Sequence, residues 1–260
     1  MLDVLEVAPS AALRPYAIRL SAYRQAGPVT RAEAAMPGSV LIVHFGEAME
    51  VAGERVISFA GGLTDRFTPT RTAGPIEGVQ IDLTPIGARR LYGIPMRHLT
   101  NRVLPVEDLL GPWAATLVAR LAETRSWRGR LALADRLLAA RIRAGPELGP
   151  EVAWAWARLL RSGGDLGVPV LAESLGWSHR HLVSRFHDQI GLTPKTAARV
   201  IRFARAARLL RAGRGIATVA AECGFYDQAH MNREFRALGD TTPGQICPRP
   251  WRVPAADWET

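Results

Sequence analysis

The sequence predicts an α+β protein whose N-terminal part is rich in β-strands and whose C-terminal part is entirely helical. Three observations predict this fold class. Short apolar runs separated by Gly and Pro occur throughout residues 1–105. Amphipathic helical patterns follow, and a helix-turn-helix pattern then occurs twice between residues 168 and 235.

The β-rich part, residues 1–105, is expected to be a small β-barrel or sandwich of the cupin-like kind. Its clearest apolar runs are residues 39–45 and 79–83, and a Gly74-Pro75 turn lies between them. Several short strands separated by turns are typical of small all-β domains. We expect this part to sense a ligand or to hold a dimer together.

The rest of the chain is expected to be helical. Apolar spacing predicts helices over residues 85–92, 112–124, 127–143 and 151–161. The glycine-containing segment from Ser162 to Asp165 is the predicted domain boundary. The predicted divisions are a β-rich domain over 1–105, a helical linking region over 106–161, a double helix-turn-helix domain over 162–250 and an irregular tail over 251–260.

Composition excludes several classes of protein. Apolar residues make up 48% of the 260 residues, enough for a sizeable core, yet no uncharged apolar run reaches the ~18 residues of a membrane span. The N-terminal segment lacks a secretory signal pattern, so a cytoplasmic protein without a membrane partner is expected. Two cysteines, Cys223 and Cys247, form neither a disulfide framework nor a metal motif, and Cys223 falls at an apolar helix position.

The charge balance favours polyanionic partners. The net charge is +9, and Lys195 is the only lysine among 33 basic residues. A positive field attracts nucleic acid and speeds encounter with it. Because so strong an arginine bias also arises from GC-rich coding, charge alone does not identify a DNA-binding protein.

The duplicated pattern carries the functional prediction. Residues 168–186 (VPVLAESLGWSHRHLVSRF) and 216–235 (IATVAAECGFYDQAHMNREF) share a short helix, a Gly-aromatic turn and a second helix. A small alanine lets the helices approach, a glycine ends the first helix, a Ser or Asp caps the second, and two apolar residues four apart form one buried stripe. These residues are Ala172, Gly176, Trp177, Ser178, Leu182 and Phe186 in the first copy, and Ala220, Gly224, Phe225, Asp227, Met231 and Phe235 in the second.

A long helix is expected to join the two units. The segment from Pro194 to Gly213 predicts a helix of about 18 residues, which is about 27 Å long. Such a rod matches the ~34 Å turn of DNA closely enough to present two second helices to adjacent segments of the major groove.

The C-terminal hundred residues resemble the AraC/XylS family of transcription regulators. The matching motifs are Gly191-Leu192-Thr193-Pro194, Arg202, Ala206-Ala207, the run from Gly224 to His230, Phe235, Gly239, Thr242 and Pro243. The N-terminal half resembles a subgroup of these regulators more weakly, through Met36-Pro37-Gly38, Gly61-Gly62-Leu63-Thr64 and the run from Leu83 to Ala88. The resemblance implies a double-stranded DNA partner, with a small-molecule effector at the N-terminal domain. RNA polymerase and a second copy of the chain are further partners compatible with it.

The face opposite each buried stripe is the predicted DNA-reading face. It comprises Ser178, His179, Arg180, Val183 and Ser184 in the first unit, and Gln228, Ala229, Asn232 and Arg233 in the second. Arginine pairs with guanine and Gln or Asn with adenine, whereas a valine makes only apolar contact, as with a thymine methyl. Because the two faces differ, the expected site is asymmetric rather than palindromic.

Other polar residues near these helices have structural explanations. His181 and His230 occupy equivalent positions, where packing or a backbone hydrogen bond is a better explanation than base contact. Glu234 and Arg185 are expected to pair with neighbours on the scaffold, and Arg202 is expected to form a scaffold ion pair.

No catalytic or metal chemistry is expected in the N-terminal half. His44 and His98 stand alone, without the clustered ligands that a metal-binding cupin needs, and no cofactor motif is present. An enzyme fused to a DNA-binding tail would need a reactive cysteine before Cys223, and none exists. The second alternative is an interaction module whose helices bind protein; it would tolerate charge reversal on the basic face.

Overall fold

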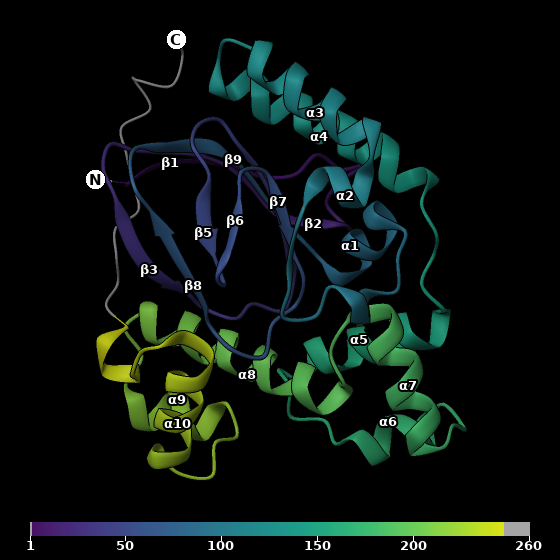
Figure 1. Ribbon diagram of the computed structural model, residues 1–260. Helices are drawn as coiled ribbons and strands as arrows, with labels where there is room; N and C mark the ends of the chain where they lie inside the picture. Colours follow the sequence, from purple (N-terminus) through teal and green to yellow (C-terminus); the bar gives the residue numbers. More distant parts are fainter. Residues whose placement is uncertain (1, 247–260) are drawn as a thin grey trace.

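The structure is a computed structural model that describes residues 2–246, and it has two lobes (Figure 1). The upper lobe in that view holds all the β-strands together with helices α1 to α4. The lower lobe is helical, and α8 runs along it from the α5–α7 group to the α9–α10 pair.

Two antiparallel sheets form the centre of the N-terminal lobe. The six-stranded sheet has the order β1-β2-β9-β4-β7-β10, and the four-stranded sheet has the order β3-β8-β5-β6. The strands are β1 (Leu2–Val7), β2 (Ala17–Gln25), β3 (Val29–Glu33), β4 (Ser39–His44), β5 (Met49–Val51), β6 (Glu54–Val56), β7 (Phe59–Gly61), β8 (Thr68–Thr72), β9 (Ile76–Leu83) and β10 (Val103–Pro105).

Burial explains why β4 and β9 are the clearest strands in the sequence. Both lie inside the six-stranded sheet, where β9 pairs with β2 on one side and β4 on the other. Almost every residue of β4 is buried, which accounts for its continuous apolar run. Gly78 in β9 is required by close packing, because an added Cβ would lie 2.6 Å from both the Tyr23 hydroxyl and the Val43 carbonyl oxygen.

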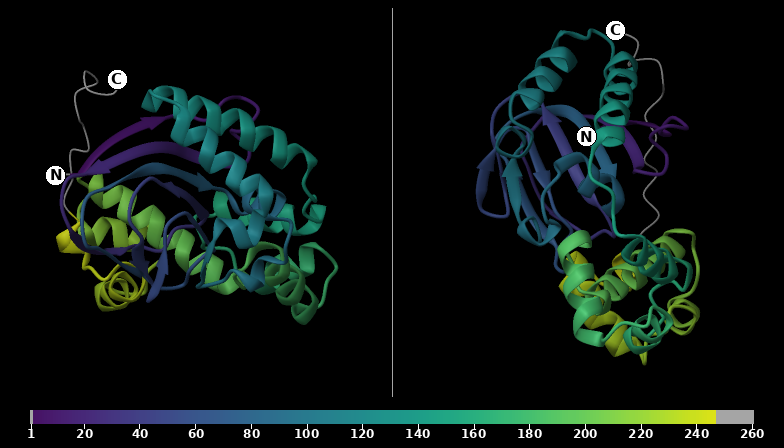
Figure 2. Two further views of the ribbon diagram at one scale, coloured as in Figure 1. Left: turned by 45° about the horizontal axis from the view of Figure 1, so that its top comes forward. Right: turned by 90° about the vertical axis from the view of Figure 1, so that its right-hand side faces the viewer.

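The first helices cover one side of the sheets. They are α1 (Pro85–Tyr92), the 3-10 helix η1 (Met96–His98), α2 (Val106–Leu110), α3 (Pro112–Glu123) and α4 (Trp127–Ala144). Helix α4 packs on both α1 and β2, and α3 lies antiparallel beside it (Figure 2). Their apolar stripes, with Leu117, Leu121, Leu131 and Leu138 fully buried, join the strands in one continuous core.

The remaining helices form a second core. They are α5 (Pro150–Arg161), α6 (Val168–Ser174), α7 (His179–Ile190), α8 (Pro194–Arg211), α9 (Ile216–Glu222), α10 (Gln228–Gly239) and the 3-10 helix η2 (Pro243–Gln245). Helix α8 lies at its centre and packs against α5, α7, α9 and α10. Two residues of the N-terminal lobe, Ala35 and Leu63, are buried in this same core.

The two lobes contact each other at both helix-turn-helix units. The Ala35 and Phe67 amides donate to the Leu238 and Ala237 carbonyl oxygens of α10, over 2.7 Å and 3.3 Å. On the other side, η1 packs on α7. There the Thr100 hydroxyl donates to the Gly191 carbonyl oxygen, and Arg97 pairs with Asp188.

The α+β prediction, with strands first and a helical C-terminal part, is confirmed. The four helices predicted between residues 85 and 161 are present, with α4 one residue longer than expected and α5 beginning at Pro150; α2 was not predicted. Cys223 is buried as expected.

The cupin-like detail of the β-rich part stays a prediction. Cys247 and the predicted irregular tail lie outside the described residues. Within residues 2–246, no helix is both long and apolar enough to cross a membrane.

Candidate nucleic-acid interface

The two helix-turn-helix units have the geometry that the repeat predicts. In the first, α6 ends before Gly176 and α7 follows; in the second, α9 ends before Gly224 and α10 follows. Both glycines adopt the left-handed conformation, with φ of +65° and +68°. A residue with a Cβ is disfavoured there, so glycine sets the sharp turn between the helices.

A side-chain oxygen caps each second helix. The Ser178 hydroxyl accepts from the His181 amide at 3.2 Å, and the Asp227 carboxylate accepts from the His230 amide at 2.6 Å. These bonds satisfy amides that the first helical turn leaves without a partner. Both predicted caps are therefore present.

The buried stripes fix which face of each helix remains outside. Leu182 and Phe186 of α7, and Met231 and Phe235 of α10, are fully buried. Phe235 packs edge-on against Phe203 of α8, with ring centroids 4.9 Å apart. Because each stripe faces the scaffold, the opposite face of each helix is left for a partner.

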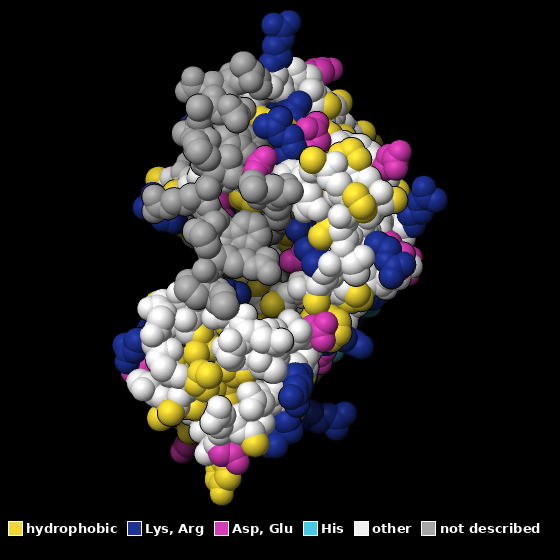
Figure 3. Space-filling view, turned by 90° about the vertical axis from the view of Figure 1, so that its left-hand side faces the viewer, with side chains coloured by type: hydrophobic (Ala, Val, Ile, Leu, Met, Phe, Trp, Pro, Cys, Tyr) yellow, Lys and Arg dark blue, Asp and Glu magenta, His cyan; other side chains and the backbone are white. Residues whose placement is uncertain are grey.

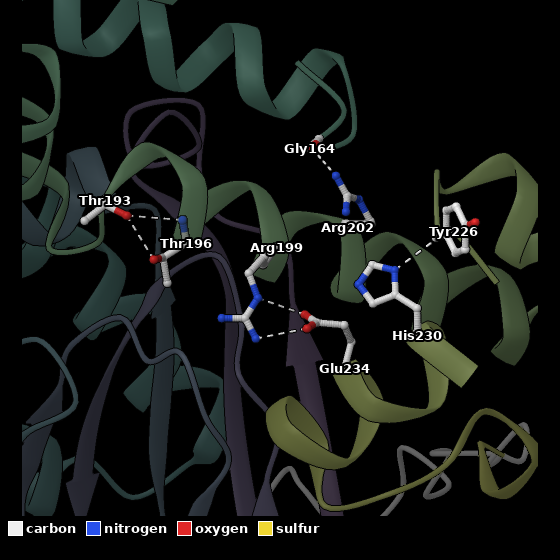
Figure 4. Close-up of polar contacts among 8 residues, drawn as sticks. All are labelled: Gly164, Thr193, Thr196, Arg199, Arg202, Tyr226, His230 and Glu234. Carbon is white, nitrogen blue, oxygen red and sulfur yellow. Dashed lines mark hydrogen bonds and ion pairs between the residues drawn. The ribbon is translucent and has the colours of Figure 1, made fainter. Parts of the chain in front are cut away.

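The two equivalent histidines stabilise the turns. His181 lies edge-on to Trp177, with centroids 4.5 Å apart, and His230 lies edge-on to Phe225 at 5.6 Å. His230 Nδ1 also accepts from the Tyr226 amide at 3.3 Å (Figure 4). The packing and backbone bond expected from the sequence are therefore observed.

The residues predicted to read DNA lie on the outer surfaces of α7 and α10. Most are exposed, whereas Val183 and Asn232 are half-buried. We refer to this set as the reading face. Its members are Ser178, His179, Arg180, Val183, Ser184, Gln228, Ala229, Asn232 and Arg233. Figure 3 shows Lys and Arg side chains along the margin of the helical lobe on the face seen there.

Two arginines of α8 hold the units in place (Figure 4). Arg199 binds Glu234 of α10 through two hydrogen bonds, of 3.0 Å and 3.1 Å, so the expected scaffold pairing of Glu234 is confirmed. Arg202 corrects an expectation. It donates to the Gly164 carbonyl oxygen at 2.9 Å and lies over the Phe225 ring instead of forming an ion pair. The backbone before α6 supplies this acceptor, and no acidic side chain is needed.

Tyr226 is an exposed aromatic residue that the sequence analysis did not include in the predicted DNA-reading face. This residue lies between the buried Phe225 and the cap Asp227, and 92% of its surface is exposed. It is the extra residue that makes the second turn longer than the first. The extra residue in the second turn could have indicated this exposure from the sequence. Phe225 is buried in the core and Asp227 caps α10, so a residue inserted between them is expected to point to solvent.

A cavity of about 810 Å³ lies in the N-terminal lobe and reaches the second lobe. The apolar part of its wall comes from both sheets and includes Ile42, Met49, Val51 and Phe59. Helix α8 closes one side with Phe203, Ala204, Ala207 and Arg211, and Arg102 lines the cavity as well. The cavity therefore lies where the N-terminal lobe meets α8, the helix that joins the two units.

His44 is buried in the N-terminal lobe, where both ring nitrogens face groups of the protein. Its Nδ1 lies 3.3 Å from the Tyr23 hydroxyl and its Nε2 lies 3.0 Å from the Glu47 carbonyl oxygen. Burial lowers the pKa of His44, while the Glu47 and Glu77 carbonyls and the Glu77 carboxylate oppose the change. Among residues 2–246, no three His, Cys, Asp or Glu side chains are grouped for a metal ion.

Comparison with known proteins assigns the helical lobe. Residues 171–247 match the model of a helix-turn-helix domain family. This region is an AraC-type helix-turn-helix domain. A 61-residue segment is 41% identical to the uncharacterized HTH-type transcriptional regulator YbfI of Bacillus subtilis (strain 168). That segment is 24% of this chain and spans 22% of the length of YbfI.

Solved structures of ToxT from Vibrio cholerae share the fold over most of the chain. One, at 12% identity, has a TM-score of 0.53 and matches 87% of this chain and 96% of ToxT. A second, with an unsaturated fatty acid bound, has 11% identity and a TM-score of 0.51 over 91% and 95% of the two chains. A third, bound to (E)-4-(8-methylnaphthalen-1-yl)but-3-enoic acid, has 10% identity and a TM-score of 0.50 over 94% and 97%. The AraC-type domain therefore lies within a ToxT-like fold.

Proposed function

We propose that this protein is a sequence-specific DNA-binding transcription regulator whose two second helices read adjacent segments of the major groove. The observation that carries the proposal is the pair of helix-turn-helix units with matched caps and exposed outer faces in an AraC-type domain. Helix α8 has 18 residues and is about 27 Å long, a span that suits two neighbouring groove segments on one side of DNA.

The two units of the reading face are suited to different contacts with bases. Arg180 in α7 and Arg233 in α10 are suited to guanine, and Gln228 is suited to adenine. Val183 provides an apolar contact in the first unit, so the second unit forms more of the hydrogen bonds to bases. One chain thus recognises an asymmetric site.

The first test is to find the site and then change one reader at a time. Purified protein is mixed with fragments of the source genome, and the retained fragments are sequenced to define a common site. Arg180→Ala and Arg233→Ala are each expected to weaken binding to that site by about 1–3 kcal/mol and to relax preference at different base pairs. The control is Arg128→Ala, which removes an exposed arginine of α4 on the other lobe.

Two results would contradict the proposal. One is the absence of any duplex-DNA retention at low salt by folded wild-type protein. The other is an equal, sequence-independent loss in the Arg128 control and in both reader variants, because removal of a distant charge cannot mimic the loss of a base contact.

We further propose that the N-terminal cavity binds a small molecule that modulates DNA binding. Its volume of about 810 Å³ lies in the range of ligand pockets. The two ToxT ligands named above are carboxylic acids on apolar bodies. Here, an apolar wall together with Arg102 and Arg211 suits the same type of amphipathic anion. Occupancy acts on DNA binding through α8, which forms one wall of the cavity and joins the two units.

A further inference from the structure

A second hollow lies between the first helix-turn-helix unit and α8, the helix that leads to the second unit, and adjoins the reading face. It has a volume of about 590 Å³ and lies among the segment before α6, the start of α7 and the first half of α8. His179 and Val183 of the reading face line one side. Lys195 and Arg199 of α8 line another. We call it the inter-unit hollow.

The hollow lies between the first unit and α8, and its α8 wall is bonded to the second unit. Its α7 wall belongs to the first unit, whereas Arg199 in its α8 wall is bonded to Glu234 of α10. Figure 4 shows Thr193, Arg199 and Arg202 along the first half of α8, with Gly164 on the facing loop before α6, and all four line the hollow. When two helices enter adjacent segments of the major groove, the sugar-phosphate backbone between those segments passes between the helices.

Among the cationic side chains that line the hollow, one has no partner within the described part of the chain. Arg199 is held by Glu234, and Arg202 donates to the Gly164 carbonyl oxygen. Asp165 is the acidic side chain of the wall. Lys195 is exposed at the first turn of α8, and within the described part of the chain it has no hydrogen-bond or ion-pair partner.

We propose that the inter-unit hollow holds the DNA backbone between the two groove segments, with the Lys195 ammonium group as its phosphate contact. This inference rests on the proposed function and adds a residue outside the reading face. A lysine ammonium is a compact charge on a flexible stem, so it pairs with a phosphate oxygen whatever the neighbouring base. Lys195 therefore contributes affinity and not base preference.

The test separates phosphate contact from base reading and from overall charge. Lys195→Gln is expected to weaken binding roughly three- to tenfold, by the same factor for the retained site and for unrelated DNA, and to lower the slope of log K against log salt by about 1. Lys195→Arg is expected to keep both slope and affinity. Arg128→Gln, which removes the same charge from α4, is expected to leave the slope unchanged.

The outcomes are distinct. An equal change in Lys195→Gln and Arg128→Gln would show only an effect of net charge and would overturn the inference. A loss confined to the specific site would make Lys195 a base reader and would overturn it too. Both results presuppose wild-type binding, so they leave the proposed function standing; absent wild-type binding would refute that function first. Thermal melts of each variant confirm that the fold is retained.

Discussion

His44 illustrates how the surroundings of one residue make stability depend on pH. Only 2% of its surface is exposed, and both ring nitrogens face groups of the protein. The Glu47 carbonyl oxygen accepts from Nε2, so the neutral ring carries its proton there and Nδ1 accepts from the Tyr23 hydroxyl. Protonation of Nδ1 would remove that acceptor inside the lobe.

The direction of the pH effect follows from the lowered pKa. The unfolded chain takes up a proton near the ordinary histidine pKa of about 6.5, whereas folded His44 takes it up only at lower pH. Unfolding therefore becomes easier as the pH falls from about 7 toward 5. Urea unfolding at pH 7.5 and 5.5 is expected to show this loss, and His44→Gln is expected to reduce it. A residual loss remains because burial, followed by the Arg97 charge, also lowers the pKa of His187. An undiminished pH effect in the variant would contradict the prediction.

Sequence reasoning at the residue scale succeeded where the interaction is local. The caps Ser178 and Asp227 each act three residues along the chain, so a short window of sequence contains both partners. It failed for Arg202, whose acceptor is the carbonyl of Gly164, 38 residues away. A backbone carbonyl has no residue-specific signature, so no sequence pattern identifies it.

At the scale of elements, alanine substitutions at the two turn glycines, Gly176 and Gly224, are expected to destabilise the protein to different extents. An added Cβ at Gly176 would meet nothing within 4 Å, so only the left-handed backbone opposes it. At Gly224 it would also lie 3.1 Å from the Asp165 carboxylate. Gly176→Ala is expected to cost about 1–2 kcal/mol in free energy of unfolding, and Gly224→Ala more than that.

Chemical denaturation of the two variants measures this difference. Gly176→Asn is the matched control, because asparagine tolerates the left-handed region better than alanine. It is therefore expected to be more stable than Gly176→Ala. Equal stability of wild type and Gly176→Ala would show that this turn is not set by glycine.

The elements also show why helices were easier to predict than the sheets. Each helix between residues 85 and 161 has its pattern within a few turns of its own sequence. The sheet order joins β2 to β9, so Ala22 lies opposite Val79, and no local periodicity specifies that pairing. The sequence thus predicted that strands exist near residues 39–45 and 79–83 but not their neighbours.

At the scale of the molecule, the cavity and the inter-lobe contacts share the same segments. Ala35 lines the cavity, and its amide donates to the Leu238 carbonyl of α10. Asn101 also lines it, directly after Thr100, which donates to Gly191 at the end of α7. A ligand in the cavity would therefore contact segments that are bonded to both α7 and α10. The sequence could not predict this arrangement, because it depends on how two separately encoded cores dock.

The effector proposal predicts a linked change in stability and DNA binding. Oleate, added below its critical micelle concentration, is expected to raise the melting temperature, because a ligand bound only by the folded state stabilises it by about 2.7 kcal/mol at a hundred times its Kd. For a chain of this size that is a shift of roughly 5–10 °C. Oleyl alcohol, which lacks the charge that Arg102 and Arg211 would bind, is expected to shift the melting temperature less.

Met36→Trp, which fills part of the cavity, is expected to abolish the shift while keeping DNA binding without oleate. If the shift persists in Met36→Trp, oleate binds elsewhere; if DNA affinity is unchanged when the wild type is saturated, the cavity does not regulate the two units.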